Sequence, residues 1–299
     1  MSEKKLTALG TASQVPTRLR NQTGLFLKWD QEGFLFDVGE GTQRQMTKMG
    51  ISASKITKIF ISHFHGDHCL GLPGVIQRIS LDQVSHVVEL YYPASGQYYL
   101  DNLLDASSYQ KNAQLKLIPI VCEGEIFEDD KISITTEPLD HPVDVFGFRI
   151  EEKNKRSMLP EKLNAYGIKG KTVGDLIKKG RINIGAKTIF LEDCSVEKKG
   201  LSMAYVMDTR LCENIFSLCR NVDLLVCEST YLQSEEELAK KYGHLTAYQA
   251  GVIAARSNVG KMALTHFSGR YTDSLVFEEE VKDVFQNGII LADGDILRV

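Results

Sequence analysis

The sequence predicts an α/β protein built from layered sheets covered by helices. Short apolar runs rich in β-branched residues alternate with helical patterns through most of the 299 residues, as is typical of sheets with helices packed on them. The first runs form hairpin-like pairs, which argues against a purely parallel sheet. The chain is 43% apolar and 25% charged, values that are ordinary for a globular protein. We therefore expect residues 1–299 to form a single domain.

The first elements follow from turn and cap signals. Gly24–Trp29 and Phe34–Val38 are predicted strands, joined by a turn near Gln31-Glu32-Gly33. Thr42–Met49 is a predicted helix, because Gly50 can supply the left-handed residue that ends many helices. Ile56–Ile61 is predicted to be a strand because it is rich in β-branched residues.

The later elements are predicted by the same periodicities. Strands are expected at Leu115–Val121, Ile132–Thr136, Val145–Ile150, Met203–Met207, Leu224–Cys227, Met262–Thr265 and Ile289–Leu291. Helices are expected at Glu235–Tyr242, Ala247–Arg256 and Leu275–Phe285.

Composition excludes several classes of protein. The sequence contains no stretch of about 18 consecutive apolar residues, and its mean hydropathy is −0.16, so no membrane span is expected. The N-terminus has no apolar run long enough for a signal peptide. None of the six cysteines forms a C-x-x-C pair, which favours reduced thiols in a cytoplasmic protein.

Charge is distributed unevenly along the chain. The net charge of −4 argues weakly against a nucleic-acid binder. Between Glu151 and Phe190, however, ten Lys and Arg residues stand against four Asp and Glu residues, and the rest of the chain carries −10. A basic segment on an acidic body points to an anionic partner for that segment. We interpret residues 151–187 as an inserted basic arm.

The strongest chemical signal is the run S-H-F-H-G-D-H at residues 62–68, directly after a predicted strand. His63 and His65 are two residues apart, so an extended backbone points both imidazoles to one side. Gly66 permits a sharp turn that brings Asp67 and His68 close to them. Imidazole nitrogens and carboxylates suit zinc. A chance H-x-H-x-D-H run is too rare for a functionless surface cluster to be the better explanation, and we predict a metal site here.

Four ligand-type residues cannot complete two metal sites, so further ligands are expected at other strand ends. His141, Asp208 and His266 each follow an apolar strand-like run. Taken alone, each would be better explained by a capping or core role. Their joint occurrence with the H-x-H-x-D-H run favours metal binding.

These residues carry a resemblance to a known family. The H-x-H-x-D-H run with His141, Asp208 and His266 resembles the metallo-β-lactamase superfamily. Within it, the chain resembles the short form of the ribonuclease Z family of tRNA 3′-processing endonucleases. The resemblance runs nearly end to end and includes the segments Pro16–Asn21, Phe36–Gln43, Gly147–Ile150, Asp208–Arg210, Gly243–Ala247 and His266–Tyr271.

The resemblance implies a fold and a metal set. The fold would be a metallo-β-lactamase αβ/βα sandwich, with two mixed sheets, helices on the outer faces and a protruding basic arm. Two Zn²⁺ ions per chain would lie at one edge, although a His/Asp site also suits Mn²⁺ or Fe²⁺. One ion would take His63, His65 and His141, the other Asp67, His68 and His266, and Asp208 would bridge them.

The resemblance also implies catalytic roles. A metal-bound hydroxide would attack the phosphorus, with Asp67 accepting the proton of the water. His244 would be the general acid that protonates the ribose 3′-oxygen, and Arg270 would hold a phosphate. From sequence alone, a capping or surface role for His244 and a surface salt bridge for Arg270 stay open.

The implied substrate is precursor tRNA, cut on its 3′ side to leave a 3′-hydroxyl. The arm residues Lys169, Lys171, Lys178 and Lys179 would grip this tRNA, in a homodimer where one subunit's arm serves the other's active site. One departure from the family pattern is that Gly167–Thr172 lacks the Gly-Pro motif of many relatives' arms.

Two alternatives stay open at this point. The first is another hydrolase of the same superfamily that acts on a small phosphodiester, sulfate ester, thioester or lactone. Thioester hydrolases and lactonases would have no use for a basic arm. The second is a catalytically silent RNA-binding protein, against which the presence of every ligand and of His244 argues.

Overall fold

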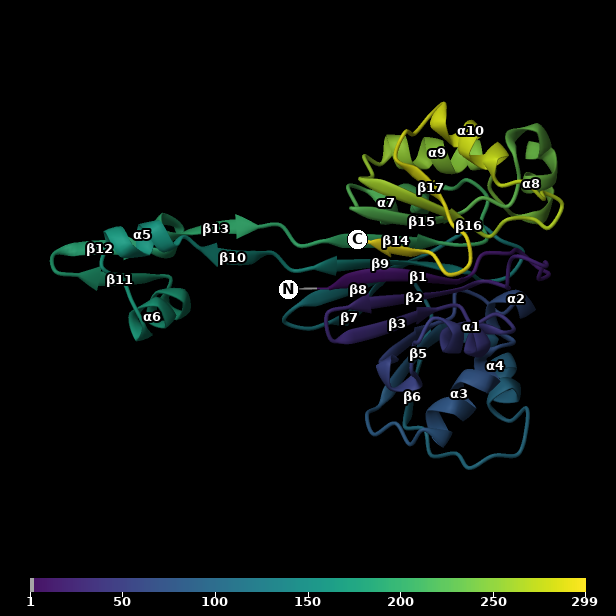
Figure 1. Cartoon of the computed structure of the whole chain (residues 1–299), viewed down its shortest axis with the longest axis horizontal. Coiled ribbons are helices and arrows are strands. Elements are labelled where there is room, and N and C mark those ends of the chain that lie inside the picture. The colour runs from purple at the N-terminus through teal and green to yellow at the C-terminus, as the bar shows by residue number, and fades with distance from the viewer. Residues whose placement is uncertain (1–2) are drawn as a thin grey trace.

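Two seven-stranded mixed sheets pack face to face (Figure 1). The computed structural model describes residues 3–299. The first sheet has the order β18-β1-β2-β3-β4-β5-β6, antiparallel as far as β3 and parallel from β3 to β6. Its strands are β1 (Lys4–Gly10), β2 (Gly24–Trp29), β3 (Glu32–Phe36), β4 (Lys58–Phe60), β5 (Val88–Pro93), β6 (Leu115–Ile120) and β18 (Ile296–Arg298).

The second sheet has the order β17-β16-β15-β14-β9-β8-β7. Strands β14 to β17 are parallel, and β14, β9, β8 and β7 are antiparallel. The strands are β7 (Gly124–Glu128), β8 (Ile132–Pro138), β9 (Phe146–Glu152), β14 (Ser202–Val206), β15 (Leu224–Glu228), β16 (Lys261–Thr265) and β17 (Gly288–Ile290).

The core between the sheets is aromatic. Phe36 and Phe60 of the first sheet stack with their ring centroids 4.9 Å apart. Phe60 lies 5.1 Å from Phe148 of the second sheet, and Tyr205 of the second sheet stacks on Phe36 at 4.9 Å. Such ring pairs add to the stabilisation gained from burial. They hold the two sheets in one relative position, and with them the loops at the strand ends.

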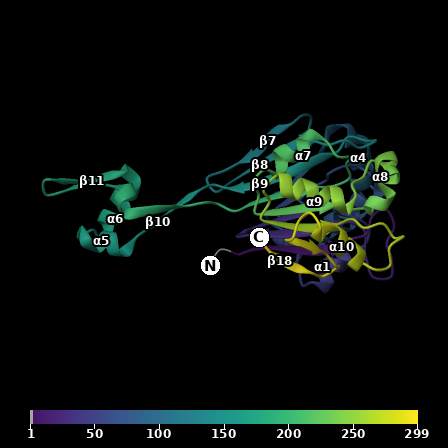
Figure 2. The same cartoon turned by 90° about the horizontal axis from the view of Figure 1, so that it is seen from above.

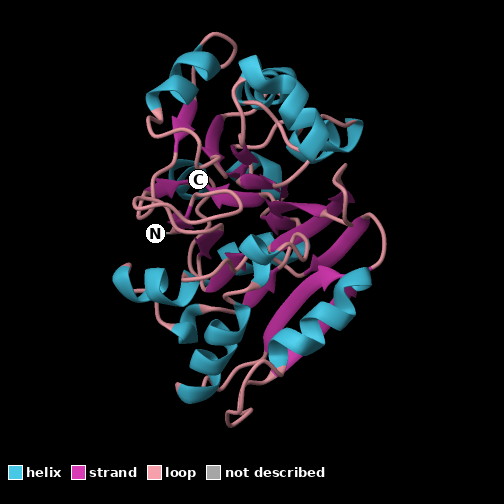
Figure 3. Cartoon of the chain, turned by 90° about the vertical axis from the view of Figure 1, so that its right-hand side faces the viewer, coloured by secondary structure: helices cyan, strands magenta, loops and turns pink. Residues whose placement is uncertain are grey.

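Helices cover both outer faces (Figure 3). On the first sheet lie α1 (Thr42–Lys48), α3 (Leu72–Leu81) and α4 (Gln97–Leu104). On the second lie α7 (Glu213–Cys219), α9 (Ala247–Arg256) and α10 (Leu275–Lys282). The short elements are α2 (Gly66–Cys69), α8 (Glu236–Tyr242) and the 3-10 turns Ala53–Lys55, Ala94–Gly96, Leu191–Cys194 and Gln233–Glu235. In the described part of the chain, no helix is long and apolar enough to span a membrane.

The residues between β9 and β14 form an arm that projects from the body (Figures 1 and 2). Its stem is an antiparallel ribbon of β10 (Lys155–Met158) and β13 (Ser195–Lys198). Its tip contains α5 (Pro160–Ala165), α6 (Lys171–Lys179), β11 (Arg181–Ile184) and β12 (Lys187–Phe190). Four buried side chains form a separate small core in the tip, namely Ile168, Leu176, Ile189 and Cys194.

The predicted fold class is confirmed, and differences lie at element ends. The predicted end of the arm at residue 187 is too early, because β13 completes the ribbon. The first hairpin turns at Asp30, whose φ is +55°, and Glu32 already belongs to β3. Predicted strand Ile56–Ile61 is shorter in the structure, because a 3-10 turn precedes Ile56 and β4 begins at Lys58.

Candidate metal centre

Ligand-type residues meet at the edge of the sandwich where α2 and α8 lie, opposite the arm (Figure 1). The loop after β4 carries His63 and His65, and α2 carries Asp67 and His68. His141 lies between β8 and β9, Asp208 follows β14 and His266 follows β16. The structure thus brings together all seven residues that the sequence singled out as ligands.

The first set of ligand atoms contains three imidazoles and one carboxylate. His65 Nδ1 lies 3.0 Å from His63 Nε2 and 3.2 Å from His141 Nε2. Asp208 Oδ2 lies 3.5 Å from His63 Nε2 and 3.9 Å from His141 Nε2. These four residues offer ligand atoms that all lie within 4.8 Å of one another.

The second set contains Asp67, His68 and His266, with Asp208 beside it. His68 Nε2 and His266 Nε2 are 3.2 Å apart. Asp67 Oδ2 lies 3.3 Å from the first of these nitrogens and 3.4 Å from the second. Asp208 faces both sets, because its Oδ2 lies near His63 and His68 while its Oδ1 lies 3.1 Å from His266 Nε2.

Hydrogen bonds behind two of the imidazoles run through Asp37. Its Oδ2 lies 2.8 Å from His68 Nδ1 and accepts the hydroxyl protons of Ser62 and Tyr205, each at 2.8 Å. Because the Ser62 hydroxyl donates to Asp37, its oxygen is free to accept from His63 Nδ1 at 3.0 Å. Both rings therefore carry their proton on Nδ1 and turn an unprotonated Nε2 inward.

Two further imidazoles, those of His141 and His266, are fixed in the same way. His141 Nδ1 donates to the carbonyl of Gly243 at 2.8 Å. His266 Nδ1 lies 2.9 Å from Thr230 Oγ1, and that hydroxyl donates to Glu228 Oε2 at 2.6 Å. Both rings again present the lone pair of Nε2 to the centre.

These contacts favour cations in the centre. Four Nε2 lone pairs point at one another and at carboxylate oxygens, an arrangement that is repulsive unless a positive charge lies between them. Asp208 Oδ1 is buried and, among the described residues, has no hydrogen-bond partner. Burial lowers the pKa of His63, His65 and His141, and neutral imidazole is the form that binds a metal. Burial acts on His68 too, but the carboxylates of Asp208, Asp67 and Asp37 outweigh it and raise the pKa of His68, so a metal ion would bind in place of a proton there. The residues present therefore fit divalent cations.

His244 lies beside both sets. Its Nδ1 is 3.1 Å from Oε1 of the fully buried Glu228, and its ring centroid is 5.3 Å from that of His141 and 5.5 Å from that of His266. Burial disfavours the imidazolium form, but the carboxylates of Glu228 and Asp208 outweigh it and raise the pKa of His244 to about 9. The ring can therefore hold a proton next to the centre.

Three residues of the centre adopt left-handed backbone at strand ends. Asp37 follows β3 with φ of +50°, Asp208 follows β14 with +39° and His266 follows β16 with +63°. Such conformations are unfavourable for residues other than glycine and persist where the surrounding structure enforces them. At each position the chain leaves its strand abruptly and aims the side chain into the centre.

Sequence reasoning missed the residues behind the ligands. Asp37, Glu228 and Thr230 have no role in the prediction from sequence, although each lies at or shortly after a strand end, as His141 and Asp208 do. Gly243 enters that prediction only as part of the segment Gly243–Ala247. Its role depends on a carbonyl, which no side-chain pattern reports.

The other predicted site residues lie elsewhere. Arg270 is paired with Glu235 and lies over the ring of Tyr231, 5.1 Å from its centroid. Lys169, Lys171, Lys178 and Lys179 are exposed on the arm, far from the ligand cluster (Figure 1). The structure therefore does not bring these four lysines to the centre of the same chain.

A cavity of about 620 Å³ is lined by the segment 16–21, by α1 and by Asp293 and Gly294. Arg18, Arg44 and Lys48 line it, and among the described residues none of these three cations has an ion-pair partner. Two residues before this segment, the Gln14 N–H donates to Asp67 Oδ2 at 2.8 Å. The chain that leads into the cavity wall therefore also contacts the ligand cluster.

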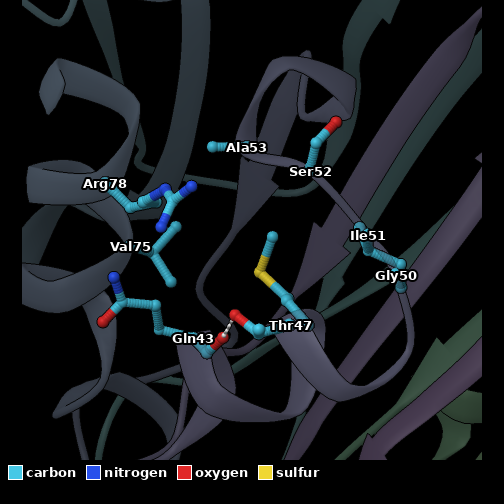
Figure 4. A pocket seen from close by; sticks show the side chains of 9 residues that line it. Gln43, Thr47, Gly50, Ile51, Ser52, Ala53, Val75 and Arg78 are labelled. Carbon is cyan, nitrogen blue, oxygen red and sulfur yellow. Dashed lines mark hydrogen bonds between the residues drawn. The ribbon is translucent and has the colours of Figure 1, made fainter. Parts of the chain in front are cut away.

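A smaller hollow of about 210 Å³ lies between α1, α3 and the loop after α1 (Figure 4). Gln43, Met46, Thr47, Val75 and Arg78 are among its lining residues, and Thr47 donates to the carbonyl of Gln43 at 3.1 Å. It contains none of the ligand-type residues, so the chemistry belongs to the edge cluster.

Known proteins resemble this chain over part or all of its length. A family model described as anti-Pycsar protein Apyc1 matches residues 4–152. The chain is 46% identical over 300 residues to ribonuclease Z of Nocardia farcinica, covering 100% of this chain and 98% of the relative. It is 47% identical over 299 residues to ribonuclease Z of Streptomyces avermitilis, again covering 100% and 98%.

Solved structures show the same architecture. Human short-form tRNase Z superposes with a TM-score of 0.73 at 24% identity, covering 99% of both chains. The metallo-β-lactamase fold protein YhfI from Bacillus subtilis superposes with a TM-score of 0.73 at 18% identity, covering 100% of both chains. At these identities the two likenesses concern the fold.

Two mixed sheets with His/Asp clusters at one edge define a protein of the metallo-β-lactamase fold whose clusters could hold metal ions. Within this fold, the relatives at 46–47% identity, which match the full length of the chain, are both ribonucleases Z. The chain belongs to the ribonuclease Z family of metal-dependent endoribonucleases.

Proposed function

We propose that this chain removes 3′ trailers from tRNA precursors and leaves a 3′-hydroxyl on the tRNA. The observation that carries the proposal is the pair of ligand sets that share Asp208, with His244 beside them. Relatives named ribonuclease Z that match the whole chain support the substrate.

We infer that two Zn²⁺ ions bind per chain, although the donor set also suits Mn²⁺ or Fe²⁺. His63, His65 and His141 would hold one ion, Asp67, His68 and His266 the other, and Asp208 would bridge them, because its two oxygens face different sets. When bound, such an ion pair supplies a hydroxide at neutral pH and stabilises charge on the phosphate.

Two side chains, Asp67 and His244, would transfer the protons that the reaction requires. Asp67 Oδ2 faces the ring nitrogens of His68 and His266 and is placed to accept a proton from the attacking water. The leaving group is a ribose 3′-oxygen, which needs a proton. His244 can donate it, because the buried Glu228 carboxylate orients its Nδ1 and favours the protonated ring.

Binding of a large polyanion is assigned to two basic surfaces. Near the centre, Arg18, Arg44 and Lys48 line the cavity beside α1 and would hold backbone phosphates. Arg270, next to the His266 loop, would add a phosphate contact if Glu235 releases it. Far from the centre, the arm between residues 153 and 199 carries twelve Lys and Arg against five Asp and Glu, including Lys169, Lys171, Lys178 and Lys179.

The arm and the centre lie at opposite ends of the same strands. β9 starts after His141 and leads into the arm, and β14 leads from the arm to Asp208. The seven residues of β9 alone separate the two by about 23 Å. An arm that points away from its own centre suits a homodimer, in which it holds tRNA for the partner's centre. Cytoplasmic localisation follows from this substrate.

The experiment is incubation of purified, zinc-loaded protein with a 3′-extended tRNA precursor, followed by mapping of both product ends. Cleavage at the 3′ side of the tRNA, with a 3′-hydroxyl on the tRNA and a 5′-phosphate on the trailer, is expected. Absence of cleavage by a preparation that hydrolyses a small chromogenic phosphodiester would favour the alternative, a hydrolase of small esters.

A further inference from the structure

The arm joins the body at a buried ion-pair cluster centred on Glu152. Glu152 is the last residue of β9, and its side chain is only 10% exposed. One carboxylate oxygen lies 3.2 Å from Nζ of Lys4, whose side chain is 3% exposed. Lys4 begins β1 in the first sheet, so this pair bridges the two sheets at the end from which the arm leaves.

The same carboxylate also binds both strands of the arm. Its Oε1 accepts a hydrogen bond at 2.5 Å from Nζ of Lys155, which is the first residue of β10. Its Oε2 accepts the N–H of Leu201, which precedes β14, at 3.3 Å. Burial would raise the pKa of Glu152, but Lys155, the Leu201 N–H and Lys4 outweigh it and lower that pKa. The charged form is therefore held by three groups, namely Lys4 of β1, Lys155 of β10 and the Leu201 N–H before β14.

The backbone between β13 and β14 packs closely against the backbone of Glu152. A Cβ on Gly200 would lie 1.9 Å from the carbonyl oxygen of Glu152, so only glycine fits here. The Gly200 N–H donates to the side chain of Asn154 at 3.0 Å, and Asn154 Nδ2 donates to Glu197 of β13 at 3.2 Å. The two strands of the stem are thus tied together next to Glu152.

From these contacts we propose that Glu152, Lys4, Lys155 and Gly200 form a root clamp that sets the direction of the arm. The stem beyond the clamp is a two-stranded ribbon of four residue pairs, and an isolated ribbon of this kind is marginally stable by itself. The direction of the arm therefore depends on its root. Glu152 is a positioning residue, since it contacts neither the centre nor the basic tip.

The effect expected on tRNA rests on the proposed function, because it requires that the arm binds tRNA. If the arm and a metal centre hold the same tRNA together, a loosened root lowers the fraction of molecules in which the arm points in the direction that this binding needs. Binding of precursor should weaken, while a small phosphodiester, which needs only the centre, should be unaffected.

The test compares Glu152→Ala with Glu128→Gln. Glu128 lies on β7 and pairs with Lys153 of the same junction, but both side chains of this pair are exposed, at 51% and 41%. Because the Glu152 carboxylate is buried and the Glu128 carboxylate is not, loss of the Glu128 pair should matter little. Nitroxides on the exposed native Cys122 and on Thr188→Cys of β12 report the distance between body and arm. The protein labelled without the Thr188 change gives the background, and dilution with unlabelled chains suppresses distances between subunits.

Glu152→Ala should broaden the distance distribution and raise KM for precursor tRNA about tenfold, with kcat and small-substrate hydrolysis unchanged. Glu152→Gln, which keeps the shape and loses the charge, should give a smaller broadening, and Glu128→Gln none. An unchanged distribution in Glu152→Ala, or equal losses on both substrates, would overturn the clamp. Failure of the wild-type protein to cut precursor would instead refute the proposed function, and the distances would still decide the clamp.

Discussion

At the residue scale, the centre separates what a sequence can reveal from what it cannot. Ligands are predictable, because His63, His65, Asp67 and His68 are adjacent in the chain and metal chemistry requires their residue types. The groups that orient these ligands by hydrogen bonds are harder to predict. Asp37 orients two imidazoles from 25 or more residues away, which depends on how β3 and β4 pair.

Asp208→Ala should damage both metal sites, since its two oxygens face different ligand sets. We expect less than half of the wild-type zinc content after reconstitution, with activity on every phosphodiester lost. Elemental analysis with a circular dichroism spectrum measures this. Asp144→Asn, a change at an exposed carboxylate close to His141 in the chain, is the matched control and should keep both ions. Full zinc content in Asp208→Ala would contradict the bridging role.

His244→Ala should lower turnover of precursor tRNA by roughly 10²–10⁴-fold with the metals still bound, because the leaving oxygen loses its proton donor. A precursor with a 3′-thio leaving group needs little protonation, so the variant should recover much of its rate on that substrate. Single-turnover rates on the two substrates provide the measurement. Equal losses on both would indicate that His244 positions the substrate.

At the scale of elements, periodicity and turn residues predict most strands and helices, while exact ends depend on tertiary contacts. The strand predicted at Phe34–Val38 stops at Phe36, because the left-handed backbone of Asp37 turns its carboxylate toward His68. The arm is predictable as a charged insertion. The end of the arm is not predictable from charge, because β13 is nearly neutral and belongs to the arm only through its pairing with β10, about 40 residues earlier in the chain.

Gly243 tests how an element positions the centre. It ends α8 with φ of +83°, and a Cβ there would lie 2.7 Å from His141 Nδ1. Gly50, which follows α1 with φ of +67°, has no atom within 4 Å of such a Cβ. Alanine at either position should cost about 1 kcal/mol of folding free energy from backbone strain. Only Gly243→Ala should also displace His141.

We therefore expect similar small losses in melting temperature for Gly243→Ala and Gly50→Ala, but weakened zinc binding and at least tenfold lower activity only for the first. Thermal unfolding, zinc titration and phosphodiester hydrolysis on both variants decide this. Equal activity in the two variants would show that the close approach of the Gly243 backbone does not constrain His141.

At the scale of the whole molecule, the candidate metal centre and the arm lie at opposite ends of the second sheet (Figure 1). Replacing residues 153–199 with a short Gly/Ser linker should nearly abolish precursor processing and leave small-substrate hydrolysis largely intact. If the arm contacts about six phosphates, the affinity for tRNA should fall steeply with salt, and most of that slope should vanish with the arm. Normal binding and cutting by the armless protein would show that the basic side chains of the arm do not contact tRNA.

The central claim is that one edge of the sandwich holds two metal ions, and that these ions are required for cleavage of precursor tRNA. The most direct test is stepwise zinc titration of chelator-treated protein, with bound metal and precursor cleavage measured on the same samples. We predict no cleavage without metal, saturation at two ions per chain, and activity that rises as the second site fills. Saturation below about one ion per chain, or cleavage by the metal-free protein, would contradict the claim.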